Sequence, residues 1–166
     1  MNAAGFTIHS AIHGARQDAQ AVMHLHTDSG VAVSSMEEGF LPLNQHAMFI
    51  YHDLAYHDWE GVALNLDERE RLVADLGQKN LMMLRNHGTL AVGGSIASCF
   101  MRLYFFERAC TIQAKVMNGT PNMPNKEAIS MMKDTFNNSD SWESIATTAW
   151  PAMKRLADRL DPSYAE

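Results

Sequence analysis

Apolar and polar residues recur along the chain with two periods, one typical of helices and one typical of short buried strands. Apolar positions three and four residues apart predict a helix over Gly5–Ala15 and a longer helix that begins after Ser95 and ends near Met117. Ala21–Thr27 and Asn80–Arg85 are short apolar runs between polar residues, and such runs predict buried strands. Helices and strands are therefore expected to share one core.

The rest of the chain continues this mixture of elements. Further helices are expected over Gly30–Met36, Asn65–Gln78, Lys126–Asn137 and Trp142–Leu160. The first of these should be capped at Asp28–Ser29, and the last should bend or break at Pro151. Met48–Tyr51 and Thr89–Val92 favour short strands, whereas the polar and aromatic segment His52–Gly61 is expected to be a surface loop. Strands mixed with amphipathic helices predict an α/β fold in which helices cover a sheet on both faces.

Composition narrows the class of protein. The chain has 166 residues, 46% of them hydrophobic, which suits one domain with one sizeable core. Its formal net charge is −6, and an acidic chain without clustered positive charge is not expected to bind nucleic acid or an anionic membrane. No stretch approaches the length of a bilayer-spanning apolar helix. Cys99 and Cys110 should lie roughly 16 Å apart along one helix, too far to form a disulfide, which favours a reduced, cytoplasmic protein.

Three histidines are the strongest candidates for chemistry. His24 and His26 lie two residues apart on a predicted strand, so both imidazoles project from one face and are able to converge on a metal ion. His87 follows the second predicted strand, in the turn Asn86-His87-Gly88. Three neutral imidazoles with an open fourth position are typical of a catalytic zinc site. In the alternative interpretation the paired histidines are only half-buried strand residues. Asn86 either orients His87, contacts a substrate or serves only the turn.

Four segments carry a resemblance to a known family. They read NAAGFTIHSAIHGARQDAQAVMHLHT, GVAVSSMEEGFLP, AYHDWEG and LRNHGTLAVG. On these motifs the chain resembles the class II aldolase/adducin family from its first residues to about Val116, and the helices of residues 125–160 match more loosely. The family includes sugar-phosphate aldolases such as L-fuculose-phosphate aldolase, L-ribulose-phosphate 4-epimerase, related decarboxylases and the adducin head domain. The resemblance implies a single domain over residues 1–166, a three-layer α/β/α sandwich with a mixed, mostly antiparallel sheet, and a homotetramer or another homo-oligomer.

The resemblance also implies a site and a reaction. His24, His26 and His87 match the family's metal-binding histidines, which usually bind zinc in the aldolases. The implied activity is that of a carbon–carbon lyase acting on a small sugar phosphate or a related hydroxy or keto compound, through an enediolate that the metal stabilises. The aldolase tyrosine falls near Gln45–His46, so His46 is the candidate proton donor in its place. Asn86 is the candidate substrate-binding residue.

The sequence also departs from the aldolases in two ways. Their proton-transferring acid falls at Gly5, which has no acidic group, and the string AGFTIHSAIH is closer to adducin-like members. These departures leave two alternatives open, a catalytically silent adducin-like assembly module and a metal-dependent decarboxylase of the same family. Relatives carry further strands and helices before the point that matches Met1, including a glycine-rich phosphate loop. The chain is therefore expected to be the metal-binding, C-terminal portion of a larger domain, truncated at its N-terminus.

Overall fold

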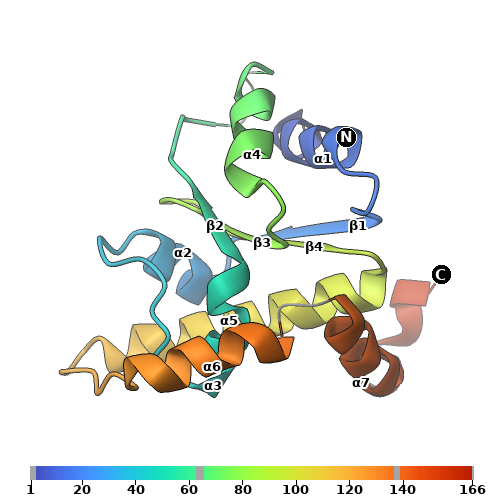
Figure 1. Cartoon of the computed structure of the whole chain (residues 1–166). Coiled ribbons are helices and arrows are strands. Elements are labelled where there is room, and N and C mark those ends of the chain that lie inside the picture. The colour runs from blue at the N-terminus through green and yellow to red at the C-terminus, as the bar shows by residue number, and fades with distance from the viewer. Residues whose placement is uncertain (1–2, 63–65, 137–138, 166) are drawn as a thin grey trace.

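The computed structural model describes residues 3–62, 66–136 and 139–165 of the chain (Figure 1). Within these residues no helix combines the length and the apolar character needed to cross a bilayer. The elements, in chain order, are α1 (Ala3–Ala15), β1 (Ala21–Leu25), α2 (Asp28–Ser34), α3 (Gln45–Ile50), the 3-10 helix η1 (Tyr51–Asp53), β2 (Leu54–His57), α4 (Glu68–Leu76), β3 (Leu81–Leu84), β4 (Gly88–Gly93), α5 (Ile96–Val116), α6 (Lys126–Phe136), α7 (Ser139–Leu160) and the 3-10 helix η2 (Pro162–Ala165).

The described strands form one mixed sheet in the order β1-β4-β3-β2. β4 pairs antiparallel with both β1 and β3, whereas β2 pairs parallel with β3. Two of these three pairings are antiparallel, which confirms the mixed, mostly antiparallel sheet expected from the sequence. β1 lies at an edge of the sheet, and its register places His24 opposite Leu90 and Leu25 opposite Thr89.

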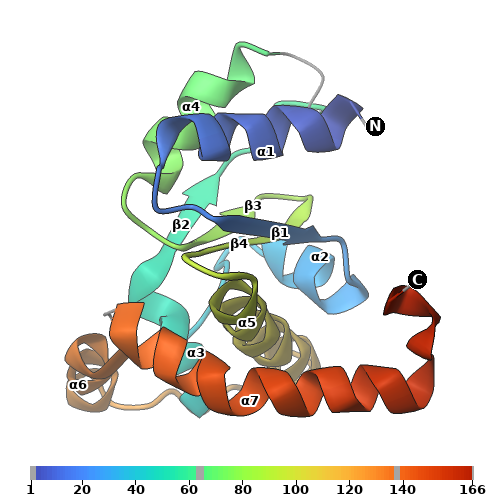
Figure 2. The same ribbon diagram turned by 90° about the vertical axis from the view of Figure 1, so that its right-hand side faces the viewer.

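Helices cover the sheet on both faces (Figure 2). α1 and α4 lie side by side over one face, and α2 and α5 lie against the other. α3 and α7 pack on the outer side of α5, and α6 packs on α3, so this second helical layer is the deeper one. The three-layer α/β/α sandwich expected from the sequence is therefore confirmed.

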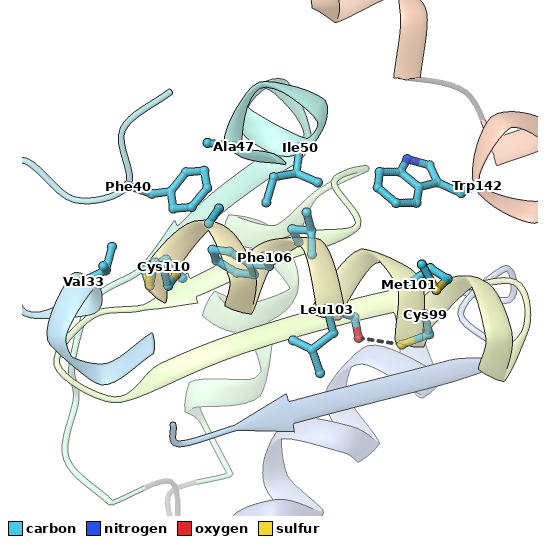
Figure 3. Close-up of a cluster of buried hydrophobic side chains, with 14 of the residues drawn as sticks. Val33, Phe40, Ala47, Ile50, Cys99, Met101, Leu103, Phe106, Cys110 and Trp142 are labelled. Carbon is cyan, nitrogen blue, oxygen red and sulfur yellow. Dashed lines mark hydrogen bonds between the residues drawn. The ribbon is translucent and has the colours of Figure 1, made fainter. Parts of the chain in front are cut away.

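The side chains of β3 show how one strand contributes to both halves of the core. Leu81 and Met83 join the cluster on the α5 side of the sheet, and Met82 and Leu84 join the cluster under α1 and α4. All four are buried because β3 is central in the sheet and both of its faces are covered. Figure 3 shows the cluster around α5, which the fully buried indole of Trp142 from α7 closes on the outer side.

The segment Met48–Tyr51 does not form the strand that the sequence favoured. Most of it lies in α3, whose cap Asn44 accepts a hydrogen bond from the Ala47 N–H at 3.1 Å. The buried residues of this helix, Ala47 and Ile50, are three positions apart and therefore share one helical face. The prediction was wrong because six residues give too few turns for the helical period to show in the sequence.

The segment His52–Gly61, expected to be a surface loop, contains the parallel edge strand β2. The last residue of β2, His57, is buried, and Nδ1 of its ring lies 2.7 Å from the Asp75 carboxylate. On the other side of the ring, Nε2 lies 3.4 Å from the Glu68 carboxylate, within ion-pair range but without a well-aligned hydrogen bond. The strand was missed because its polar residue is buried against partners on α4 that the local sequence does not show.

The helix ends show which caps the sequence identified correctly. Thr27, rather than Asp28–Ser29, caps α2, and its hydroxyl accepts from the Gly30 N–H at 3.0 Å. Ser95 caps α5 as predicted, within a reciprocal capping box. Pro151 is exposed and lies inside α7, which continues past it, so of the expected bend or break the break does not occur.

The other helices and strands agree with the sequence to within a few residues. Two expected helix boundaries, Asn65 and Asn137, lie outside the described residues. In the described part of the chain the corresponding helices are α4, which starts at Glu68, and α6, which ends at Phe136. Local periodicity was therefore sufficient to place most of the elements that surround the site.

Candidate metal centre

Three histidine side chains meet at the end of β1. The Nε2 atoms of His26 and His24 are 2.6 Å apart, and Nε2 of His24 is 3.3 Å from Nε2 of His87. One ligand nitrogen from each ring lies within 4.8 Å of the other two. The fold therefore brings together the three residues that the sequence singled out, although His24 and His87 are 63 positions apart.

The orientation of His24 and His26 follows from strand geometry. His24 lies in β1, and His26 is the first residue after the strand ends, so the spacing of two residues keeps both rings on one side of the sheet. Leu25, between them, points to the other side and is 41% exposed. The sequence spacing alone was enough to predict this half of the cluster.

His87 is held by a turn with an uncommon backbone conformation. Asn86 has a φ of 56°, in the left-handed region that asparagine tolerates better than most residues. The Asn86 N–H donates to the Ser34 carbonyl at 3.1 Å, and the His87 N–H donates to the Leu84 carbonyl at 3.1 Å. Asn86 therefore fixes the turn that presents His87, while its contact with a substrate stays a prediction.

Gly88 allows β4 to approach β1 closely beside the histidines. A Cβ at this position would lie 2.3 Å from the carbonyl oxygen of Leu25 and 3.3 Å from Cδ2 of His26. Any side chain would therefore push the two strands apart at the point where they carry His26 and His87.

Hydrogen bonding and burial set the protonation of the cluster. Nδ1 of His24 lies 2.9 Å from the carbonyl oxygen of Thr89, and because a carbonyl only accepts, Nδ1 carries the proton and Nε2 presents its lone pair. Burial lowers the pKa of His24 to about 4, and burial together with the nearby His26 lowers the pKa of His87. Both rings are therefore neutral at pH 7. Three converging nitrogens, one of them the unprotonated Nε2 of His24, fit a divalent ion such as zinc.

Lowering the pH is expected to destabilise the metal-free protein. The pKa of folded His24, about 4, is below its unfolded value of 6.5, so between these values the unfolded chain binds a proton that the folded chain does not. The free energy of unfolding should therefore decrease as the pH is lowered through this window, by up to about 1.4 kcal/mol per pH unit for this group. Urea unfolding in the presence of EDTA at several pH values would measure the slope. His24→Gln should show a shallower slope, and equal slopes for the two proteins would contradict the assignment.

Open space and exposed aromatic rings adjoin the cluster. A groove of about 590 Å³ lies between α1, β1 and α5, and His9, His24 and Tyr104 are among the residues that line it. The ring of Trp59, which is 49% exposed, lies 5.3 Å from the ring of His87 with the two planes at 81°. A small molecule therefore has room next to the histidines.

The two remaining candidate positions lie in different surroundings. Gly5 precedes His9 by one turn of α1, so both occupy one face of this helix, and His9 lines the groove together with His24. Among the described residues no carboxylate joins the three-histidine cluster. His46 lies on α3 with its ring 5.5 Å from that of Phe105, and the fold does not bring it into the cluster within this chain. Its role as a proton donor stays a prediction.

Two residues that support the cluster escaped the sequence interpretation. Thr89 holds His24 through its backbone carbonyl, and Glu107 of α5 accepts a hydrogen bond from the Thr89 hydroxyl. A signal for Glu107 was present in the sequence. It lies four residues after Leu103 and three before Cys110, both buried, so a carboxylate interrupts an otherwise apolar face of the helix.

Comparisons with known proteins agree on one family. The family described as "Class II Aldolase and Adducin N-terminal domain" matches residues 1–114. A putative aldolase class 2 protein of Caulobacter vibrioides is 51% identical over 167 residues, which cover 100% of this chain and 65% of that protein. Alpha-adducin of Mus musculus is 40% identical over 118 residues, or 70% of this chain and 16% of that protein. The structure of L-fuculose 1-phosphate aldolase from Glaciozyma antarctica superimposes with a TM-score of 0.80 at 26% identity, covering 96% of this chain and 61% of that one.

Proposed function

The chain belongs to the class II aldolase and adducin family, and from this premise we propose that His24, His26 and His87 bind one divalent metal ion, with zinc as the expected ion. The observation that carries the proposal is the convergence of the three Nε2 atoms, with Nδ1 of His24 tied to a backbone carbonyl. The three imidazoles would hold the ion and leave room for a further ligand, and the ion would supply Lewis acidity to carbonyl and hydroxyl oxygens.

We propose that the whole protein uses this centre in lyase-type chemistry on a small hydroxy or keto compound, with sugar phosphates as the expected class. The similarity to a protein named L-fuculose 1-phosphate aldolase supports this choice. The chain's own residues contribute in three ways. Burial keeps His24 neutral, the carbonyl of Thr89 holds the proton of this ring on Nδ1, and the exposed ring of Trp59 offers a surface beside His87. A homo-oligomer is part of this proposal.

A second candidate function is a metal-binding, adducin-like module for assembly or protein contacts without catalysis. Gly5 favours it, because a residue without a side chain stands where the aldolases have their proton-transferring acid. The 40% identity to alpha-adducin over 70% of this chain favours it as well. A metal-dependent decarboxylase is the third candidate, since stabilising an enolate does not need that acid at the same place.

Metal uptake by the full chain tests the proposal. We expect about one Zn²⁺ per chain by elemental analysis after dialysis, and saturable binding in a competition titration against a coloured chelator. Less than about one tenth of an ion per chain, with no saturable binding, would contradict the metal site.

Activity of the metal-loaded chain separates the candidate functions. Sugar phosphates should release an aldehyde if the protein is a lyase, and β-keto acids should release carbon dioxide if it is a decarboxylase. Binding of one ion, together with inertness of the whole native protein toward both panels, supports the assembly module.

A further inference from the structure

We infer that Glu107 is a positioning residue for the metal centre, because its single carboxylate ties together the two segments that carry the three histidines. The inference rests on the metal site proposed above. Glu107 lies on α5, which packs against the sheet, and it is partly buried. Among the described residues its carboxylate accepts hydrogen bonds from threonines and does not join the three-histidine cluster, so it would act through its neighbours.

The carboxylate of Glu107 accepts two hydrogen bonds from threonine hydroxyls. Oε2 accepts from Thr27, the residue after His26, and Oε1 accepts from Thr89, two residues after His87. The hydroxyl oxygen of Thr27 already accepts from the Gly30 N–H at 3.0 Å, so its proton is free to go to Glu107. Two charge-assisted hydrogen bonds therefore link the end of β1 to the start of β4.

The same network reaches the third histidine through the backbone. Thr89 donates its hydroxyl proton to Glu107, while its carbonyl oxygen accepts the Nδ1 proton of His24 at 2.9 Å. Thr89 is fully buried, so neither of its groups has water as an alternative partner. A shift of Thr89 would therefore rotate the His24 ring and change the tautomer or direction of its Nε2.

The described residues around this carboxylate leave room for it and form no ion pair with it. A Cβ on Gly30 would lie 3.1 Å from Oε1 of Glu107 and 3.0 Å from Oγ1 of Thr27, so the glycine provides the space that the network occupies. Among the ion pairs of the described residues none involves Glu107. Its two threonine partners are therefore what the carboxylate is placed to bind.

The test measures metal affinity and stability in variants of the full chain. Glu107→Gln keeps the shape of the side chain, but its one amide oxygen accepts from only one threonine and an NH₂ group faces the other. Thr89→Val removes the hydroxyl that donates to Glu107 and keeps the side-chain volume nearly constant. We expect each variant to weaken Zn²⁺ binding about 10- to 100-fold, and the double variant to bind no more weakly than the weaker single one. The visible spectrum of the Co²⁺-loaded protein should shift as well, because it reports ligand direction.

Glu143→Gln is the matched control. Glu143 of α7 accepts a hydrogen bond from the Ser95 hydroxyl at 3.0 Å. Ser95 caps the start of α5, about 18 Å along the axis of α5 from Glu107. This variant should lower the urea midpoint without changing the Zn²⁺ affinity by more than about twofold.

The outcomes separate this inference from the function on which it rests. A wild-type chain that takes up no metal would overturn the metal site itself. A wild-type chain that binds metal, with Glu107→Gln and Thr89→Val within about twofold of it, would overturn the role of Glu107 and leave the site standing. The proposed role of Glu107 also fails if Glu143→Gln weakens Zn²⁺ binding as much as Glu107→Gln does, since the loss of metal would then follow from general destabilisation. If Glu107→Gln does not fold, the Zn²⁺ affinity of Thr89→Val alone tests the role of Glu107.

Discussion

Replacing His87 with alanine is expected to abolish specific Zn²⁺ binding. His24 and His26 would remain adjacent on one side of β1, but two imidazoles from one segment hold an ion far more weakly than three. We expect the dissociation constant to rise at least about 100-fold. Stabilisation by the ion, about 2.7 kcal/mol at a concentration 100 times the wild-type dissociation constant, should then largely disappear. Calorimetric titration and thermal unfolding with and without Zn²⁺ would measure both effects.

His46→Ala is the matched control for this experiment. His46 is a histidine on α3 that packs against Phe105, away from the cluster, so its removal should leave the Zn²⁺ affinity unchanged within about twofold. A loss of activity with unchanged metal affinity would support its predicted role as a proton donor. Retention of wild-type affinity by His87→Ala would instead show that His87 is not a ligand.

Gly88→Ala is expected to damage both the fold and the cluster. The new methyl group would lie 2.3 Å from the Leu25 carbonyl oxygen, and that oxygen belongs to a paired strand that is not free to move aside. Overpacking of this kind costs about 3 kcal/mol, and here the displaced backbone also carries His26 and His87. The urea midpoint should fall and Zn²⁺ binding should weaken together.

Gly14→Ala provides the comparison for Gly88→Ala. Gly14 lies in α1, is exposed, and a Cβ there meets no atom within 4 Å. Because alanine is the better helix former, this variant should be neutral or more stable by up to about 1 kcal/mol. Equal effects of the two substitutions would show that close strand approach is not what Gly88 provides.

The site illustrates how far local patterns reach. The pairing of His24 with His26 was predictable because side chains alternate along a strand and the spacing needs no information from elsewhere. His87 was identified as a candidate by its place after a strand, but the neighbouring residues do not indicate on which face of the sheet its ring lies. Its meeting with His24 depends on the antiparallel pairing of β1 with β4 and on the absence of a side chain at Gly88.

The errors in the fold have a related cause. The six-residue helix α3 was mistaken for a strand, and β2 was taken for a loop because the strand ends in His57. In both segments the outcome was decided by contacts with distant elements, α5 for the helix and α4 for the strand. Short segments carry too few residues for their own period to outweigh such contacts.

The sequence by itself determined the long elements and the cap at Ser95, because these depend on neighbours within a few positions. It also supplied the candidate histidines, and the resemblance to the aldolases placed a glycine, Gly5, at the position of their acid. Only the tertiary structure decided that the three imidazoles converge, that Nδ1 of His24 carries the proton, and that Glu107 links the two histidine-bearing segments through hydrogen bonds. The physical reason is that strand register and helix packing set these distances, and both arise from contacts between residues far apart in the chain.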